Sequence, residues 1–352
     1  MTDPTGPNGA GIRGQQLPEG MGSRASRLEV KALPRSLVEE AAALFAGNYR
    51  KARERQPLLP AGHADGEGVL RKLAGLAAGE QGVAVERDGH LVGYGIGLAI
   101  PEWHGWRCAL MPEWAHATVP AGCPQIYRVM YEALARQWAA DGRVCHLICM
   151  LADGAPLDEW QWMGFGLQCV DAVRGLTPPA GPTTRCDIKR AEPADAAMVA
   201  GLMAELTGHL SDAPVFLPPE VPPAPAEVEA HLTDPERACF LALLDDRTVG
   251  YITVRSANPE AGWVLQDPCT ASIDGAYTLP QYRGQGVATA LLGEAVRWAR
   301  DSGYGRCAVD FEAHNAQGAR FWLRHFEPVS YAAVRVIGAS RSDGRLATPP
   351  DS

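Results

Sequence analysis

A glycine-bearing turn followed by a helical pattern is the part of this 352-residue sequence whose residue types could do chemistry. It reads QYRGQGVATALL from Gln281, with glycines at 284 and 286 and a cation at Arg283. The first backbone N–H groups of a helix have no partners within the helix, and glycine leaves room for an anion to approach them. With the helix dipole and Arg283 added, the turn predicts a phosphate or pyrophosphate site.

Two common phosphate-binding motifs do not fit this turn. A P-loop requires GxxxxGK[ST], and no Lys-Ser or Lys-Thr follows here. A dinucleotide-binding GxGxxG follows the first strand of its domain. This turn instead comes late in its half of the chain, after Pro280, and lacks the third glycine.

The residues around the turn predict the strands and helices that must position it. The Asp245-Asp246 pair between two alternating apolar stretches predicts a hairpin. Further strands are expected at 186–191, 271–279, 306–311 and 329–337, and helices at 193–210, 226–232, 285–302 and 315–324. This order is typical of an α/β or α+β domain with one mixed sheet flanked by helices.

The first half of the chain repeats this pattern. LVGYGIG at 91–97 matches TVGYITV at 248–254, an offset of 248 − 91 = 157. Trp138 and Trp298 lie 298 − 138 = 160 apart, and Phe165 and Phe326 lie 326 − 165 = 161 apart. Matches in one order at nearly constant offset indicate two tandem domains of one fold. The predicted boundaries are a disordered tail 1–26, a first domain 27–175, a Pro- and Gly-rich linker 176–185, a second domain 186–340 and a disordered tail 341–352.

The turn resembles the acetyl-CoA signature of the GCN5-related N-acetyltransferase (GNAT) superfamily, Q/R-x-x-G-x-G/A. Gln281, Gly284 and Gly286 match every specified position. The family's next segment has an Asn, a small residue, an aromatic pair and a Phe, which here are Asn315, Gly318, Phe321, Trp322 and Phe326. The resemblance spans residues 185–340 and implies two tandem GNAT-like domains, each a central mixed sheet flanked by helices.

The resemblance implies acetyl-CoA as cosubstrate and an amine as acceptor. The backbone of the strand before the turn would hydrogen-bond the pantetheine arm, the amides of the turn would hold the pyrophosphate, and Asn315 would contact the cofactor arm. Trp322 stands where many relatives carry a Tyr that protonates the departing thiolate. The implied cofactor-binding residues are Tyr277, Thr278, Leu279, Gln281, Arg283, Gly284, Gln285, Gly286, Val287, Ala288, Asn315 and Trp322.

Amide formation from a thioester requires a base that takes a proton from the amine. Asp310 and Glu312 lie two apart on one predicted strand and so face the same side, and Asp274 lies on the neighbouring strand. Any of the three is a candidate base, with Asp310 and Asp274 favoured. Because indole is no practical proton source, Tyr277 or water would protonate the thiolate in place of the missing Tyr, or the thiolate would leave without being protonated. The backbone N–H groups of 277–279 could polarise the thioester carbonyl.

The first half lacks a comparable turn. Counting back 298 − 284 = 14 residues from Trp298 reaches Gly284, and the same count from Trp138 reaches Pro124; Ile126 corresponds to Gly286 in the same way. Proline has no N–H to offer, and isoleucine has bulk where an anion would approach. The first domain is therefore predicted to be a degenerate copy, retained for packing or for shaping the acceptor cleft.

Three functions fit the sequence. The first is an acetyl-CoA-dependent N-acetyltransferase whose second domain acylates a primary amine of a small molecule or peptide. The second is a non-catalytic acyl-CoA-binding regulatory module, which Trp322 and the degenerate half favour, and the third is a scaffold with an unused site. The segment 205–235 would line the acceptor cleft, and its acidic residues suit a cationic amine; they are Asp212, Glu220 and Glu229, with His209 beside them.

Composition narrows the partners and the location. The net charge of −9 disfavours nucleic acid and anionic membranes as partners. No apolar run is long enough to span a bilayer, and the first residues have no signal-peptide pattern. The nine cysteines are odd in number without CxxC spacing, and the nine histidines include no HExxH. The sequence predicts a reduced cytoplasmic protein without a metal site, either monomeric or homodimeric.

Overall fold

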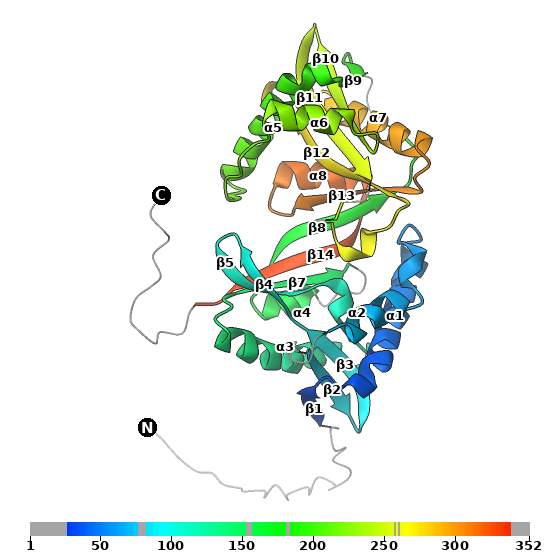
Figure 1. Cartoon of the computed structure of the whole chain (residues 1–352), viewed down its shortest axis with the longest axis vertical. Helices are drawn as coiled ribbons and strands as arrows, with labels where there is room; N and C mark the ends of the chain where they lie inside the picture. Colours follow the sequence, from blue (N-terminus) through cyan, green and yellow to red (C-terminus); the bar gives the residue numbers. More distant parts are fainter. Residues whose placement is uncertain are drawn as a thin grey trace, which may run out of the picture.

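The computed structural model describes residues 27–76, 82–152, 157–180, 184–256, 258–259 and 261–338. The two predicted disordered tails, 1–26 and 341–352, lie outside the described residues. Figure 1 shows two α/β halves stacked along the long axis of the molecule, with the first half at the lower end. No helix in these ranges is both long enough and apolar enough to cross a membrane.

The second half follows the predicted order of elements. Asp245 and Asp246 both take positive φ angles, 49° and 62°, as the two central residues of a tight hairpin turn do. The observed elements are β9 Asp187–Arg190, α5 Ala196–Ser211, α6 Pro225–Thr233, β10 Arg237–Leu244, β11 Arg247–Ser256, β12 Thr270–Thr278, α7 Val287–Asp301, β13 Arg306–Glu312, α8 Ala316–His325 and β14 Glu327–Val336. The predicted mixed α/β fold is confirmed.

The first half has a similar order of elements. They are β1 Leu28–Ala32, α1 Val38–Arg55, α2 Glu67–Ala74, β2 Gly82–Arg87, β3 His90–Ile96, β4 Leu98–Trp103, β5 Trp106–Met111, β6 His116–Thr118, α3 Cys123–Ala140, β7 Cys145–Leu151, α4 Leu157–Trp162 and β8 Gly166–Arg174. The matched LVGYGIG and TVGYITV segments both lie in the third strand of their half, β3 and β11, and Trp138 and Trp298 lie in α3 and α7.

The last strand of each half lies among strands of the other half. The ten-stranded sheet has the order β4-β5-β7-β14-β8-β13-β12-β11-β10-β9, so β14 lies between β7 and β8, and β8 lies between β14 and β13. A separate four-stranded sheet, β1-β2-β3-β6, belongs to the first half. The sequence did not predict this exchange, because the boundary drawn at residue 175 separates β8 from the strands with which it pairs.

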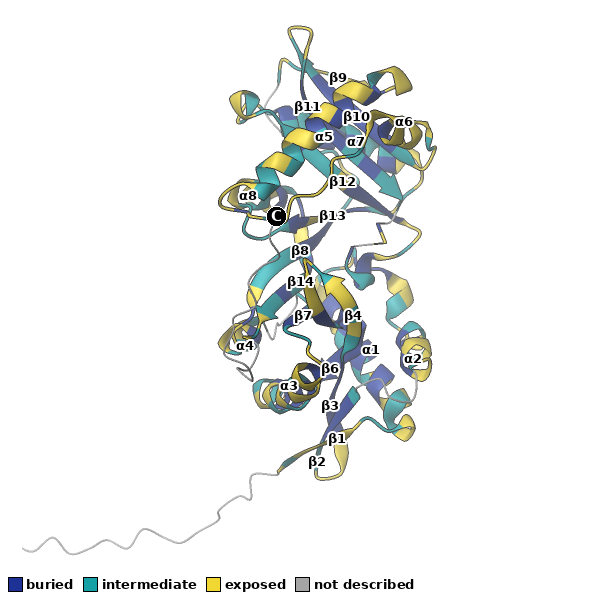
Figure 2. Ribbon diagram, turned by 60° about the vertical axis from the view of Figure 1, so that its left-hand side comes forward, coloured by how far each residue is buried: buried dark blue, intermediate teal, exposed yellow. Residues whose placement is uncertain are grey.

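Helices cover both faces of the large sheet in the second half. Alternate residues of β10, β12 and β13 pack on α7, among them Phe240, Ile273 and Val309. Residues on the opposite face, including Leu241 of β10 and, past the bulge at Asp274, Tyr277 of β12, pack on α5 and α6. We call these two surfaces the α7 face and the α5 face. Figure 2 shows β10 to β13 mostly buried or half-buried beneath helices whose outer sides are exposed.

Candidate functional site

Helix α7 begins with open backbone. Its N-cap residue, Gly286, has φ 82° and makes no capping hydrogen bond through a side chain, and Gly284 has φ 76°. L-residues with a side chain rarely adopt such angles, so glycine is required at both positions. A Cβ placed on Gly284 would meet no other atom within 4 Å, so the space beside the turn is free. The turn therefore leaves space beside the first backbone N–H groups of α7, where the sequence predicts an anion.

Arg283 is tied to both sides of this turn. Its Nε donates a hydrogen bond to the Thr278 carbonyl at 3.0 Å, and its Nη1 donates to Gln317 Oε1 in α8 at 2.6 Å. Its guanidinium also lies over the ring of Tyr277, 5.3 Å from the ring centre. The positive charge is thus fixed between the end of β12, the start of α7 and the start of α8.

Strands β12 and β13 separate just before this turn. They pair in parallel only from Thr270–Arg306 to Ile273–Val309. Asp274 is left over as a bulge residue between the β11 pairs of Ile273 and Gly275. Beyond the bulge, β12 pairs only with β11 and β13 pairs only with β8, which opens a wedge between them. A wedge of this kind exposes backbone hydrogen-bonding groups on the β12 side.

Only part of the predicted pantetheine-binding backbone faces the wedge. The Leu279 N–H already donates to the Val249 carbonyl at 2.9 Å, so it points toward β11. Backbone groups alternate in direction along an antiparallel strand, so those of Thr278 point the other way, toward the wedge. The Thr278 carbonyl is the group that Arg283 contacts there.

Asp310 lies beside the wedge on the α5 face. Its side chain is exposed to solvent, yet protein atoms surround it closely enough that desolvation raises its pKa to about 6. The neighbouring carboxylates Glu312 and Asp274 also raise the pKa of Asp310, and a hydrogen bond from Asn258 Nδ2 to Asp310 Oδ1 at 3.5 Å lowers it. The three carboxylates predicted from the sequence are therefore close neighbours.

Asp274 differs from Asp310 in having cations beside it. Arg237 and Arg255 lie 3.5 Å and 3.8 Å from its Oδ2. It also borders a cavity of about 160 Å³ between α5, α6 and the sheet, in the region predicted for the acceptor. The other lining residues are Val199, Met203, Pro223, Val228, His231, Leu232, Arg237, Ala238, Cys239, Thr253 and Val254.

Tyr277 and His209 meet on the α5 face next to the turn. Their ring centres are 6.1 Å apart, and Tyr277 is buried. Burial raises the pKa of Tyr277, and nearby Arg283 partly opposes this rise. Burial and the Arg283 charge lower the pKa of His209, which favours the neutral imidazole. Both side chains are therefore available as uncharged hydrogen-bonding groups at neutral pH.

Three other predicted residues make structural contacts. Asn315 caps α8, with its Oδ1 accepting the Gly318 N–H at 3.1 Å. Trp322 lies in the core between Phe321 and Phe326, with ring centres 4.9 Å and 5.6 Å away. Gln281 is exposed, and its carbonyl accepts a hydrogen bond from Gln285 Nε2 at 3.2 Å. The packing of Trp322 explains an indole at this position without a role in proton transfer.

The correspondence proposed for the first half needs a correction. Helix α3 begins at Cys123 after Gly122, which has φ 79° and takes the place that Gly286 takes in α7. Pro124 and Ile126 are therefore inside α3, which extends about one turn further toward its N-terminus than α7 does. The start of α3 is covered all the same, because a Cβ on Gly122 would lie 2.6 Å from Arg87 Nη2, and Arg87 donates to the Ala121 carbonyl.

Sequence reasoning missed the contributions from the boundary between the halves. Asn258 carries no motif, yet it is the hydrogen-bond partner of Asp310. Asp171 in β8 is the direct cross-strand partner of Asp310. No signal in the sequence predicted this pair, because it depends on the strand exchange.

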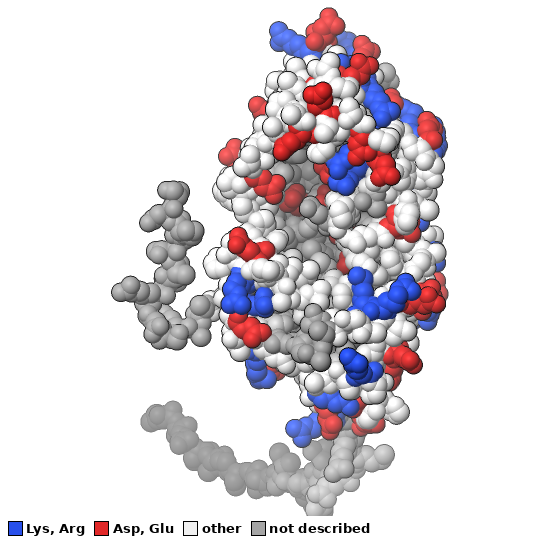
Figure 3. Space-filling view, viewed as in Figure 1, with Lys and Arg blue, Asp and Glu red and all other residues white. Residues whose placement is uncertain are grey.

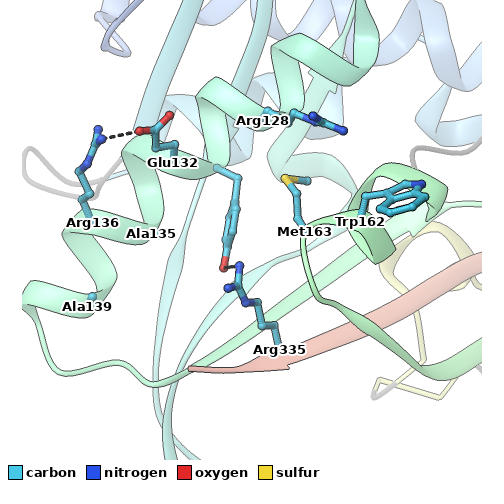
Figure 4. Close-up of a pocket in the computed structure, with 9 residues that line it drawn as sticks. Arg128, Glu132, Ala135, Arg136, Ala139, Trp162, Met163 and Arg335 are labelled. Carbon is cyan, nitrogen blue, oxygen red and sulfur yellow. Dashed lines mark hydrogen bonds and ion pairs between the residues drawn. The ribbon is translucent and has the colours of Figure 1, made fainter. Parts of the chain in front are cut away.

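Figure 3 shows one face of the molecule hollowed near its middle, with charged residues of both signs around the hollow. A different surface hollow of about 620 Å³ lies in the first half between α3, α4 and β14 (Figure 4). Its charged groups contact one another, Arg136 with Glu132 and Arg335 with the Tyr131 hydroxyl, and it contains none of the predicted site residues.

Comparison with known proteins gives consistent matches. The model of the acetyltransferase (GNAT) family matches residues 205–326, which include the turn, Asp310 and Asn315. An aminoglycoside N(6′)-acetyltransferase of Stenotrophomonas maltophilia is 34% identical over 131 residues, which are 37% of this chain and 78% of that protein. An uncharacterised N-acetyltransferase of Mycobacterium tuberculosis is 29% identical over 122 residues, 32% of this chain and 72% of that protein.

The whole architecture also has a counterpart among solved structures. A GCN5-related N-acetyltransferase from Sphaerobacter thermophilus is 18% identical, with a TM-score of 0.53, and the match covers 88% of this chain and 95% of that one. The shared fold therefore extends through both halves. Because the relative from Stenotrophomonas is matched over most of its own length at this identity, the chain belongs to the acetyltransferase (GNAT) family, whose enzymes use acetyl-CoA as acyl donor.

Proposed function

We propose that the second half of this enzyme transfers the acetyl group of acetyl-CoA to a primary amine of a small molecule or peptide, with Asp310 as the base. One observation carries the proposal. The open start of α7, the wedge between β12 and β13, and a carboxyl whose pKa is raised to about 6 lie next to one another. The open helix start suits the diphosphate of acetyl-CoA, the wedge suits its pantetheine arm, and the carboxyl suits the reacting amine.

The residues present fit acetyl-CoA. The free amides at Gly284–Ala288 would hold the pyrophosphate, helped by the helix dipole and the fixed charge of Arg283. The backbone of Thr278 in the wedge would hydrogen-bond the pantetheine arm. Held by these residues, acetyl-CoA would supply the acetyl thioester that reacts with the amine. The Asn315 side chain would act mainly by fixing the start of α8.

Asp310 suits the proton transfer better than the other two carboxylates. A base works best when its pKa lies close to the working pH, and the pKa of Asp310 is raised toward neutral pH. In the reaction the amine nitrogen forms the new C–N bond, the C–S bond breaks, and the proton from nitrogen passes to Asp310 directly or through water. Tyr277, which keeps its proton at neutral pH, or water would then protonate the thiolate.

The acceptor is expected between α5, α6 and the strands. The charge of Asp274 at the cavity is offset by Arg237 and Arg255, but the nearby segment 205–235 carries further carboxylates. Such a site suits a cationic amine. The relative from Stenotrophomonas is an aminoglycoside N(6′)-acetyltransferase, and aminoglycosides are polycationic amines. We therefore place small cationic amines first among the candidate acceptors.

We also infer that the first half is a degenerate copy of the second. The equivalent order of elements and the corresponding positions of Trp138 and Trp298 support this inference. Arg87 covers the start of α3, whereas the space beside Gly284 is open. In the first half the place of β12 is taken by two short strands, β5 and β6, separated by Pro112–Ala115. The strands of the first half that correspond to the β12–β13 wedge are therefore arranged differently.

The test is thiol release from acetyl-CoA with a panel of amines. We expect a small cationic amine to raise release well above slow hydrolysis, and Asp310→Asn to remove most of the increase. Asp274→Asn is the matched comparison, and we expect it to raise the KM for the amine more than it lowers kcat. Calorimetric titration should show that both variants bind acetyl-CoA as wild type does. If no amine raises release, the assignment of an amine acceptor is wrong.

A further inference from the structure

Part of the connection between β11 and β12 in the second half, which we call the segment and which comprises the described residues 258–259 and 261–266, is packed into the first half. Within it, the Trp263 ring centre lies 4.1 Å from that of His63 and 5.9 Å from that of Phe45 in α1. Val264 and Leu265 are buried in the same core as α1 and Tyr94. The first half therefore determines where this segment lies.

Two buried carboxyls of the first half hold the backbone of the segment. Asp171 Oδ1 accepts the Gly262 N–H at 2.7 Å, and Glu113 is hydrogen-bonded by the Trp263 N–H and by Ser330 Oγ at 2.7 Å. Asp171 and Glu113 are only 5% and 2% exposed. A Cβ on Gly262 would lie 2.7 Å from Glu113 Oε1 and 2.8 Å from Asp171 Oδ2, so both carboxyls converge on this glycine.

The other end of the segment contacts the proposed base. The Asn258 N–H donates to Ser272 Oγ at 3.1 Å, and Asn258 Nδ2 approaches Asp310 Oδ1 at 3.5 Å. Asp171 is also the cross-strand partner of Asp310, and Ser330 is the partner of Asp171 on its other side. Residues directly opposite on neighbouring strands share a face of the sheet. A row of polar side chains thus runs from the base across the boundary between the halves.

We propose that Asp171 and Glu113 are positioning residues of the first half that hold the segment at Gly262 and Trp263, and through Asn258 set the charge state of Asp310. We call this pair of carboxyls the clamp. The proposal rests on the proposed function, because it takes Asp310 as the base. It makes the first half a working part of the acetylation site.

The surroundings of the clamp favour the protonated, neutral form of each carboxyl. Desolvation, with the mutual repulsion of the two groups, raises the pKa of Asp171 well above its usual range, and desolvation raises the pKa of Glu113. A neutral Asp171 leaves Asp310 free to carry the charge.

The titrating groups that face Asp310 are known from the elements around it. Glu312 lies on its own strand, Asp274 on β12, and Asp171 and Cys169 on β8. Of the hydrogen bonds to its side chain, the one from Asn258 favours the carboxylate form. Releasing the segment should therefore raise the pKa of Asp310.

The decisive comparison is Asp171→Leu against Asp171→Asn. Leucine fills the volume and keeps water out but leaves the Gly262 N–H without an acceptor, whereas the Asn amide oxygen accepts it. The pKa of Asp310 is read by NMR on protein with carboxyl-labelled aspartate, with the resonance assigned by its loss in Asp310→Asn. We expect wild type and Asp171→Asn to titrate alike, and Asp171→Leu to titrate at higher pH.

Val173→Ala is the matched structural control. Val173 lies two residues along β8 in the same core as Leu265, so this change should lower the melting temperature without moving the pKa of Asp310. Asn258→Ala breaks the link at its other end and should raise the pKa of Asp310 even if Asp171→Leu does not fold. An unchanged titration in either Asp171→Leu or Asn258→Ala would overturn the clamp. The NMR reading needs no turnover, so it separates this outcome from a failure of the proposed function.

Discussion

Arg283 and Gln317 join the two helices that border the proposed pyrophosphate site. The Arg283 guanidinium comes from the turn before α7 and donates to the amide oxygen of Gln317 in the first turn of α8, at 2.6 Å. Its Nε also holds the Thr278 carbonyl at the end of β12. Arg283 therefore ties the start of α7 to both the end of β12 and the start of α8.

The glycine turn should lose cofactor affinity when a side chain is added. Gly284→Val places a branched side chain where the pyrophosphate would lie, in addition to a backbone cost of roughly 1–2 kcal/mol for a residue with φ 76°. Gly303→Val is the control, since Gly303 has φ 86°, is equally free of neighbours and lies at the far end of α7. We expect calorimetry to show at least tenfold weaker acetyl-CoA binding for Gly284→Val alone. Equal affinities in the two variants would contradict the assignment.

The acetylation rate should depend on the ionisation of Asp310. Its pKa is raised to about 6, so the basic form is present above pH 6 and is lost as the pH falls through that value. We expect kcat/KM for the amine to fall about tenfold per pH unit well below pH 6. Asp310→Asn should lower the rate by about 10²- to 10⁴-fold and remove this acidic limb. If the acidic limb of the pH–rate profile persists in Asp310→Asn, the base is another group, and Asp274 is the next candidate.

Stability should fall with rising pH because of the buried acid Asp171. Its folded pKa is raised, so its favourable contribution is complete below about pH 4 and is lost progressively above that, while the unfolded chain releases the proton and the folded chain keeps it. Each pH unit in this range changes the free energy of unfolding by up to about 1.4 kcal/mol for one such group. Asp171→Asn should therefore gain stability relative to wild type as the pH rises from 4 to 7.

Denaturant titration at several pH values checks this. Val173→Ala serves as the control, because it changes packing on the same strand without changing the number of titrating groups, and its curve should run parallel to wild type. A constant difference between wild type and Asp171→Asn across the pH range would show that Asp171 is ionised in the folded chain.

The two halves should not separate after the chain is cut between them. A protease site placed within residues 176–185 leaves β8 paired with β13 and β14, and β14 paired with β7. We expect the two fragments to elute together under native conditions and to separate only in denaturant. The second-half fragment expressed alone should be poorly soluble, because β13 would lose one partner strand, β8, and β14 would lose both of its partners, β7 and β8. A soluble second-half fragment that binds acetyl-CoA would show that the exchange is dispensable.

Local features of the site could be predicted from the sequence. The turn from Gln281 to Ala288 was predicted from its glycines together with their match to the GNAT signature, and the shared face of Asp310 and Glu312 follows from strand alternation. The hairpin at Asp245-Asp246 depends on residues adjacent in sequence. By contrast, counting back from Trp138 placed the start of α3 one turn too late. The offset between the two tryptophans does not reveal that α3 is longer than α7 at its N-terminus.

The sequence alone determined the order of strands and helices, the repeat of that order and the open start of α7, since each depends on neighbouring residues and on backbone preferences. Tertiary structure decided that β8 and β14 exchange places, and so that Asp171 lies opposite Asp310 and that Glu113 reaches the segment after β11. Pairing between distant strands leaves no periodic signal in the chain. The charge state of a carboxyl depends on what surrounds it, so the pKa of Asp310 is a property of the folded boundary between the two halves.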